Sequence, residues 1–241
     1  MSLTTDDWLS VVAPYLPRSL ISAEGRERIR SLCRHLPGCL LCAIEIRLDG
    51  DPAGADLSLQ FDSPYQAGQV PRWLTPPHVR DFLARWSTPD SDLAHLRAVW
   101  LEFDLERPFA EIPLPGLWAN LAAETSCDGL LAAIVPGLYA RPPSPALLAT
   151  VERCCAELPA DARLLYVARM LSCPSEALRM EFVDLGFDQI LDYLERVARP
   201  GTGERVERQV GPFVAGAGRF HLSFDVEAEV QLRIGIEFAF S

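Results

Sequence analysis

The sequence predicts an α+β fold: an antiparallel sheet built from repeated helix–strand–strand units, with helices covering one face and a polar opposite face. Segments in which apolar and polar residues alternate strictly, such as 177–185 and 219–226, are typical of strands with one buried face. Helix-like segments with apolar residues at three- and four-residue spacing lie between them. Of 241 residues, 49% are hydrophobic and 23% are charged, which suits a large folded domain and excludes a disordered chain.

The elements are predicted to follow one another as pseudo-repeats of a single domain, residues 1–241. The predicted helices are 22–35, 77–86, 145–158, 187–198 and 205–215, and the predicted strands are 39–48, 56–62, 96–105, 163–172, 177–185, 219–226 and 230–240. They group into units at about 22–62, 77–105, 145–185 and 205–240. The Pro- and Gly-rich stretch 106–144 is predicted to be irregular, and no partner for the strand 96–105 is evident in it.

Capping residues mark several of these boundaries. Ser144 and Pro145 form a suitable N-cap and first turn for the helix 145–158. The helix 187–198 ends just before Pro200, which cannot continue a helix. Repeats of two strands and a helix favour an antiparallel sheet whose apolar face is covered by helices.

The last two strands form a hairpin whose register follows from their pattern. If Val226 lies opposite Val230, all apolar residues fall on one face. The pairs are then Phe224 with Leu232, Leu222 with Ile234, Phe220 with Ile236, Ser223 with Arg233, His221 with Gly235, and Arg219 with Glu237. Residues 231–240 are expected to present an open sheet edge unless another strand pairs with them.

The polar face of the predicted sheet gathers ionisable residues from every unit. The residues that we select as ligand-binding candidates are His221, Asp225, Arg233, Glu237, Arg179, Glu181, Glu102 and Trp100. Carboxylates and guanidiniums on a concave surface can bind a polar ligand. On a solvated face, the same side chains would only form cross-strand ion pairs. Because Glu recurs in all units, the structural interpretation is favoured over catalysis.

His221, Ser223 and Asp225 share one strand face, as the members of a nucleophilic triad would need to do. Alternate residues of a strand lie ~6.6–7 Å apart, however, which is too far for a proton relay. His221 as a ligand contact, or as a general base beside Asp225, is the better interpretation.

Cys33, His35, Cys39 and Cys42 are close enough in sequence to suggest a zinc site. Cys39 and Cys42 are three residues apart at the start of a predicted strand, and we therefore expect them to point to opposite faces. Buried core thiols and a His at a helix end are the favoured interpretation, with no metal and no cofactor.

The overall charge limits the classes of partner. The net charge is −11, and every basic residue is Arg, since the sequence contains no Lys. Lysine chemistry is therefore excluded, and an acidic chain argues against nucleic-acid binding. No apolar run is long enough to span a membrane and no leader is recognisable, so seven Cys indicate reduced thiols in the cytoplasm.

The succession of helix, strand and strand, with ionisable residues opposite the helices, resembles the ABBA-type prenyltransferase barrels. In that family such repeats close an antiparallel barrel whose polar lumen holds an aromatic acceptor and an isoprenoid diphosphate. The resemblance is one of architecture and extends over about 150 residues; it includes no sequence motif, and the family's diphosphate-binding Lys has no counterpart here.

The leading hypothesis is a non-enzymatic accessory protein that binds a peptide or another polar ligand. An extended peptide would add to the edge at 231–240, while the polar face reads its side chains. The same edge could instead form a homodimer. The alternatives are a small enzyme, such as an ABBA-like transferase, with a pocket around His221, Asp225, Arg233 and Glu237, or a dimeric scaffold protein.

Overall fold

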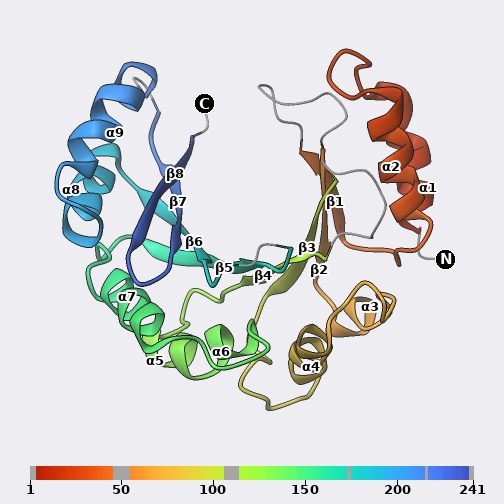
Figure 1. Cartoon of the computed structure of the whole chain (residues 1–241), viewed down its shortest axis with the longest axis horizontal. Helices are drawn as coiled ribbons and strands as arrows, with labels where there is room; N and C mark the ends of the chain where they lie inside the picture. The colour runs from red at the N-terminus through yellow and green to blue at the C-terminus, as the bar shows by residue number, and fades with distance from the viewer. Residues whose placement is uncertain (1–3, 46–54, 106–113, 173–174, 215–216, 239–241) are drawn as a thin grey trace. The chain divides into compact units, whose positions relative to one another are not determined.

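A computed structural model of the chain describes residues 4–45, 55–105, 114–172, 175–214 and 217–238. The chain divides into two compact units, which we treat separately (Figure 1). Unit 1 comprises Met1–Ala119 with Met170–Pro174, and unit 2 comprises Asn120–Arg169 with Ser175–Ser241. None of the helices in the described ranges is long and apolar enough to cross a membrane.

In the described part of unit 1, four α-helices and the 3-10 turn Ala13–Tyr15 accompany antiparallel strands. The helices are α1 (Thr5–Val12), α2 (Ala23–Cys33), α3 (Pro64–Ala67) and α4 (Pro77–Trp86), and the strands are β1 (Leu41–Glu45), β2 (Asp56–Phe61), β3 (Ala98–Asp104) and β4 (Gly116–Asn120), whose last residue belongs to unit 2. β1 pairs with β2, and β2 with β3, in antiparallel register. The alternating apolar side chains of β2 and β3 are fully buried. They form part of the core of unit 1.

Unit 2 carries β5 to β8, antiparallel strands that are neighbours in sequence order. The strands are β5 (Arg163–Met170), β6 (Leu178–Leu185), β7 (Phe220–Val226) and β8 (Val230–Phe238). The α-helices are α5 (Cys127–Gly129), α6 (Val135–Gly137), α7 (Pro145–Ala156), α8 (Phe187–Val197) and α9 (Thr202–Val210). The π-helical turn Leu130–Ile134 precedes α6, and the 3-10 turn Gly211–Phe213 follows α9. The predicted α+β class with antiparallel strands is confirmed.

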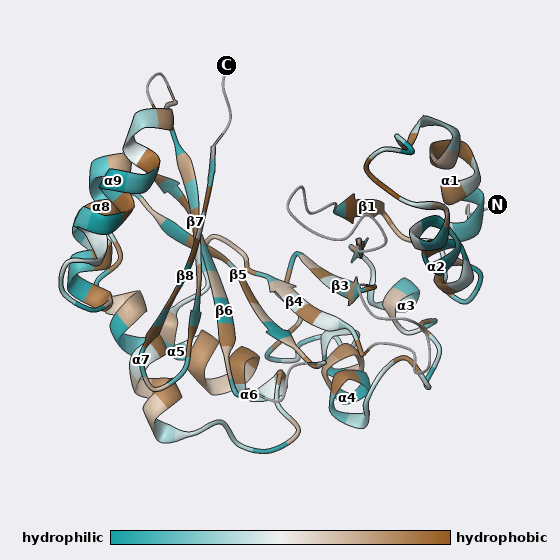
Figure 2. Cartoon of the chain, turned by 45° about the horizontal axis from the view of Figure 1, so that its top comes forward, coloured by the Kyte–Doolittle hydropathy of each residue, from teal (hydrophilic) through white to brown (hydrophobic). Residues whose placement is uncertain are grey.

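Helices cover the apolar face of the sheet in unit 2, as the alternation of hydropathy along the strands requires (Figure 2). Tyr193 of α8 is fully buried against Phe182 of β6 and Phe224 of β7. Its hydroxyl donates a hydrogen bond of 2.9 Å to the carbonyl of Cys154 in α7. One aromatic residue therefore ties two helices to the two central strands.

The stretch 106–144, which was predicted to be irregular, contains regular structure. β4 lies there and is the neighbour of β3 in the strand order, so it is the partner that the sequence left unidentified. β4 has only five residues, and its sequence GLWAN lacks the polar–apolar alternation that identified the other strands. Along the chain, helical segments are followed by two strands four times.

The predicted register of the last hairpin is wrong by two residues along most of its length. Val226 pairs with Val230 as expected, but Phe224 pairs with Ile234 and Ser223 with Gly235. The register shifts between Phe224 and Val226, where β8 contains two residues more than β7. A shift of two residues leaves every side chain on its original face, and so the hydrophobic pattern cannot detect it.

Candidate functional site

The polar face of unit 2 is organised by cross-strand pairs. Arg179 of β6 lies directly opposite Asp225 of β7. Two hydrogen bonds, of 2.8 Å from Nε and 3.1 Å from Nη2, join the guanidinium to the two carboxylate oxygens. Such a bidentate fork fixes both side chains, each of which remains partly accessible from the polar face.

Beside this fork, Glu181 of β6 contacts His221 of β7. The distance between Glu181 Oε1 and His221 Nδ1 is 3.1 Å. The Glu181 side chain is only 12% exposed, whereas that of His221 is 46% exposed. Burial raises the pKa of the Glu181 carboxyl, and the negative charge of Glu237 raises it further, against the smaller opposing effects of His221 and Arg179. Because its pKa is raised, the Glu181 carboxyl holds a proton to a higher pH than an exposed Glu does.

The structure brings six of the eight predicted ligand-binding residues together in unit 2. Glu237 lies opposite His221 across β7 and β8, and Arg233 is exposed on the same strand. Glu102 and Trp100 lie on β3 in unit 1 instead. The indole Nε1 of Trp100 is buried, and no hydrogen-bond partner for it occurs among the described residues.

The side chains of Asp225 and His221 have different partners on this face. Asp225 is held by Arg179, and His221 is oriented by Glu181. Ser223 lies opposite Glu181 on one side and Gly235 on the other. A Cβ atom on Gly235 would lie 2.5 Å from the Ser223 hydroxyl oxygen, so this part of the surface is closely packed.

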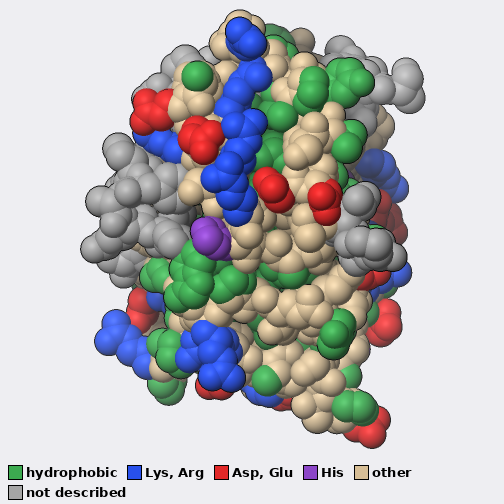
Figure 3. Space-filling view, turned by 90° about the vertical axis from the view of Figure 1, so that its right-hand side faces the viewer, with side chains coloured by type: hydrophobic (Ala, Val, Ile, Leu, Met, Phe, Trp, Pro, Cys, Tyr) green, Lys and Arg blue, Asp and Glu red, His purple; other side chains and the backbone are tan. Residues whose placement is uncertain are grey.

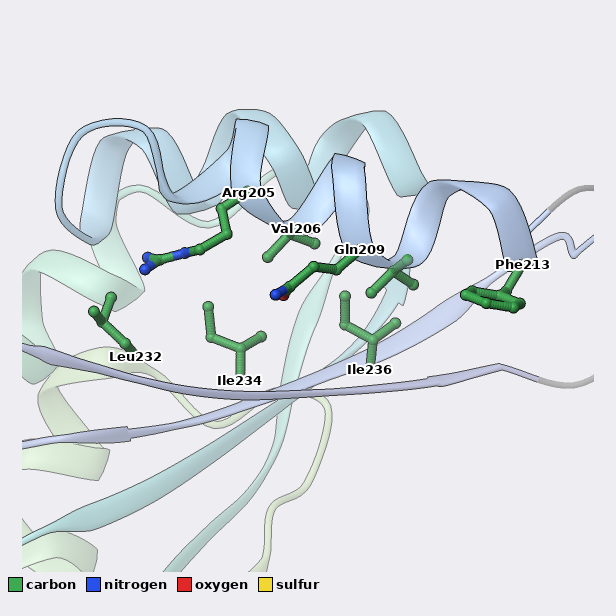
Figure 4. Close-up of a pocket in the computed structure, with 8 residues that line it drawn as sticks. Arg205, Val206, Gln209, Phe213, Leu232, Ile234 and Ile236 are labelled. Carbon is green, nitrogen blue, oxygen red and sulfur yellow. The ribbon is translucent and has the colours of Figure 1, made fainter.

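A groove on the opposite, apolar face of β8 was missed by the sequence analysis. It has a volume of about 300 Å³ and is lined by Arg205, Val206, Gln209, Val210, Phe213, Leu232, Ile234 and Ile236. Ile234 and Ile236 point from β8 toward α9, while Val206 and Gln209 point from α9 toward the strand (Figure 4). Phe213 is 68% exposed and Leu232 is 43% exposed, so apolar surface is left uncovered at the groove.

The cysteine-rich segment of unit 1 extends from α2 to β1. Cys42 of β1 is buried in the core, whereas Cys39 is half-buried. Cys39 precedes β1, and the alternation of a strand does not yet apply to it. No group of three or more His, Cys, Asp or Glu side chains in the described ranges is arranged to hold a metal ion.

Unit 1 also displays a row of Arg side chains on the side of α1 and α2 (Figure 3). α2 and its C-cap carry Arg26, Arg30 and Arg34 at four-residue spacing. Arg26 donates to the carbonyl of Leu16 at 2.6 Å, and Arg30 forms an ion pair of 2.9 Å with Glu27. These contacts hold the guanidiniums of Arg26 and Arg30 within unit 1, and we favour the surfaces of β8 as the functional site.

Comparison with known proteins gives no further guidance to this site. No protein-family model matches the chain, and neither the curated proteins nor the solved structures include a significant match.

Proposed function

We propose that the protein is a non-enzymatic accessory factor that binds an extended peptide segment of another protein as an additional strand on β8. The observation that carries the proposal is the combination of a sheet edge and an apolar groove on one strand. β8 is the last strand in the order and has one neighbour, β7, among the strands that the structure describes. Its other edge can therefore offer main-chain hydrogen bonds to a peptide.

The two faces of β8 suggest what the peptide looks like. Successive side chains of an added strand point alternately to the two faces of the sheet. Those on one side would enter the groove beside Ile234, Ile236 and Phe213, which favours apolar residues. Those on the other side would lie near Arg233 and Glu237, which favours an acidic and a basic residue respectively. We therefore propose a peptide with alternating apolar and charged residues.

Proline substitutions separate the two edges of β8. The N–H groups of successive residues point to opposite edges of a strand, so one of Ile236 and Glu237 directs its N–H to β7 and the other to the outer edge. We would select binders from displayed random peptides of nine residues, the length of β8. The selected peptides would then be tested against Ile236→Pro and Glu237→Pro, with Glu237→Ala as the side-chain control.

We expect one proline variant to lose stability, because it breaks a bond to β7. The other should keep its melting temperature and lose peptide binding, while Glu237→Ala should still bind. Selected peptides should show alternating apolar residues. Undiminished binding by the proline variant that keeps its stability would contradict strand addition. If the free protein has twice the mass of one chain and its β8 edge is already paired, a second copy occupies that edge. The protein would then be a dimeric scaffold.

A small enzyme remains the second candidate, supported by the raised pKa of Glu181 beside His221. An ABBA-like transferase would use the surface around His221, Asp225, Arg233 and Glu237. In that case an NMR titration of His221 should shift when a diphosphate is added. A peptide-binding protein would show no shift with diphosphate and a shift only with the selected peptides.

The proposal includes the setting of the protein. We propose a cytoplasmic location, consistent with seven Cys, and function without a cofactor, nucleic acid or membrane. We also propose that the four helix–strand–strand segments are repeats of one structural unit, which their order along the chain supports.

A further inference from the structure

The groove between α9 and β8 has a charged end and an apolar end. Of the residues that line it, only Arg205 is charged. The Arg205 side chain extends from α9 toward Leu232, whereas Phe213 lies at the other end, beyond Ile236 (Figure 4). Leu232 and Ile236 are four residues apart, which is ~13 Å along an extended strand. The groove is therefore long enough to receive three successive side chains from one face of an added strand.

Arg205 differs from the neighbouring Arg residues in its partners. The other Arg residues of α8, α9 and the turn between them each form an ion pair: Arg196 with Glu157 at 3.0 Å, Arg199 with Glu229 at 3.0 Å, and Arg208 with Glu204 at 3.8 Å. Arg205 forms no ion pair with a residue that the structure describes. Its guanidinium donates a hydrogen bond of 3.4 Å to the hydroxyl of Thr202, which is longer than the usual range. Most of its hydrogen-bonding capacity is thus available to a ligand.

The surroundings of Arg205 favour an anion as that ligand. An Arg side chain stays charged throughout the physiological pH range. Arg205 is half-buried, as is Ile234 on the floor of the groove. Because water is partly excluded there, a charge pair is stronger than on an open surface. A planar guanidinium also matches a carboxylate, which it binds through two parallel hydrogen bonds.

We propose that the peptide bound on β8 carries an Asp or Glu side chain that binds Arg205; this rests on the strand addition proposed above and specifies its ligand. The acidic residue belongs to the series of side chains that face the groove, at the end beside Leu232. The next two residues of that series are apolar and contact Ile234, Ile236 and Phe213. The ligand is thus an extended segment with one acidic and two apolar residues at every second position.

This acidic residue is distinct from the one expected near Arg233. Arg233 directly precedes Ile234 in β8, so the two side chains point to opposite faces of the sheet. A peptide residue beside Arg233 therefore belongs to the other series. In a bound peptide, an acid that shares the spacing of the apolar residues is assigned to Arg205.

The test uses the selected nine-residue peptides, acetylated and amidated so that only side chains supply carboxylates. We expect strong binders to carry Asp or Glu in the groove-facing series. Changing that residue to its amide should weaken binding to the unmodified protein roughly tenfold and should have no effect on binding to Arg205→Gln. The charge-reversed Arg205→Glu should prefer a peptide with Lys at this position.

Arg208→Gln is the matched control. It removes the same charge from the same helix, but Arg208 does not line the groove. We expect this variant to bind the acidic peptide like the unmodified protein. The melting temperature of each variant shows that it is folded. Because the comparison of acid and amide peptides also uses the unmodified protein, a destabilised Arg205 variant would not prevent the test.

The outcomes separate this ligand from the strand addition itself. If the edge-directed proline variant of β8 abolishes binding, but neither Arg205→Gln nor loss of the peptide acid weakens it, strand addition holds and the role of Arg205 is wrong. Binding only by peptides with a free C-terminal carboxylate would also contradict an acidic side chain. If binding ignores the proline variant, or if a second copy of the chain already fills the groove, both proposals fail.

Discussion

Glu181 shows how a residue on the polar face acquires an unusual pKa. Its carboxyl is mostly buried and lies near Glu237, and both effects raise its pKa, whereas contact with His221 only partly compensates. A buried carboxylate of this kind lowers stability when it is ionised. Glu181 in its ionised form therefore lowers the stability of the fold. Residues of this kind are common at functional surfaces.

The first prediction concerns the pH dependence that Glu181 causes. The native carboxyl holds its proton to a higher pH than the unfolded one, so the free energy of unfolding decreases as pH rises from about 4.5 through the raised pKa. Glu181→Gln removes this loss and can still accept a hydrogen bond from His221. We expect its melting temperature at neutral pH to rise by roughly 2–4 °C, with no gain at pH 4.

The matched control is Glu237→Gln. It removes one cause of the shift and should lower the pKa of Glu181 in an NMR titration of the carboxyl carbons. An unchanged Glu181 titration in this variant, or a destabilised Glu181→Gln protein at neutral pH, would show that the charges on this face are arranged differently.

At the residue scale, the sequence identified which side chains share a face, but it did not predict which of them pair. Period-2 alternation places Arg179, Glu181, His221 and Asp225 on one side of the sheet. Their pairing depends on the register between β6 and β7, which are separated along the chain by α8 and α9 and are not joined by a short turn. Local patterns carry no information on such a register.

At the element scale, the hairpin of β7 and β8 gives the second lesson. Its turn and its faces were predicted, but the two additional residues in β8 were not, because Leu232 and Arg233 continue the alternation without interruption. The consequence is functional. The shift places Glu237, and not Gly235, opposite His221, and it makes Gly235 the neighbour of Ser223.

This register can be tested by a double-mutant cycle. Gly235→Ala should destabilise the protein by about 1 kcal/mol, because the new Cβ would lie 2.5 Å from the Ser223 hydroxyl oxygen. Ser223→Ala should restore most of the loss in the double variant, as measured by urea denaturation. His221→Ala serves as the control. Rescue by His221→Ala, with none by Ser223→Ala, would support the simpler register that the sequence predicted.

The groove between α9 and β8 could not be predicted from either element alone. The sequence shows that Val206, Val210 and Ile234 are apolar, and burial in a core would be the ordinary expectation for such residues. That α9 stands over β8 with Phe213 left exposed depends on how the helix packs on the sheet. Phe213 follows α9 and is exposed. Its exposure shows that the apolar residues here line a groove and not a closed core.

At the scale of the whole molecule, the fold class followed from composition and periodicity, because these depend only on local pattern. The division into two compact units did not, since it reflects contacts between distant segments. The β8 edge, the groove and the polar cluster all lie in unit 2. The proposed peptide site therefore depends on unit 2 alone.

Residue-resolved amide hydrogen exchange along β8, with and without a selected peptide, tests the central claim most directly. In the free protein, we expect alternate amides of Val230–Phe238 to exchange quickly and the remaining ones, bonded to β7, to be protected. The peptide should protect the fast set. If the fast set stays unprotected in the complex, or if every β8 amide is already protected in the free protein, the outer edge of β8 is not the peptide site.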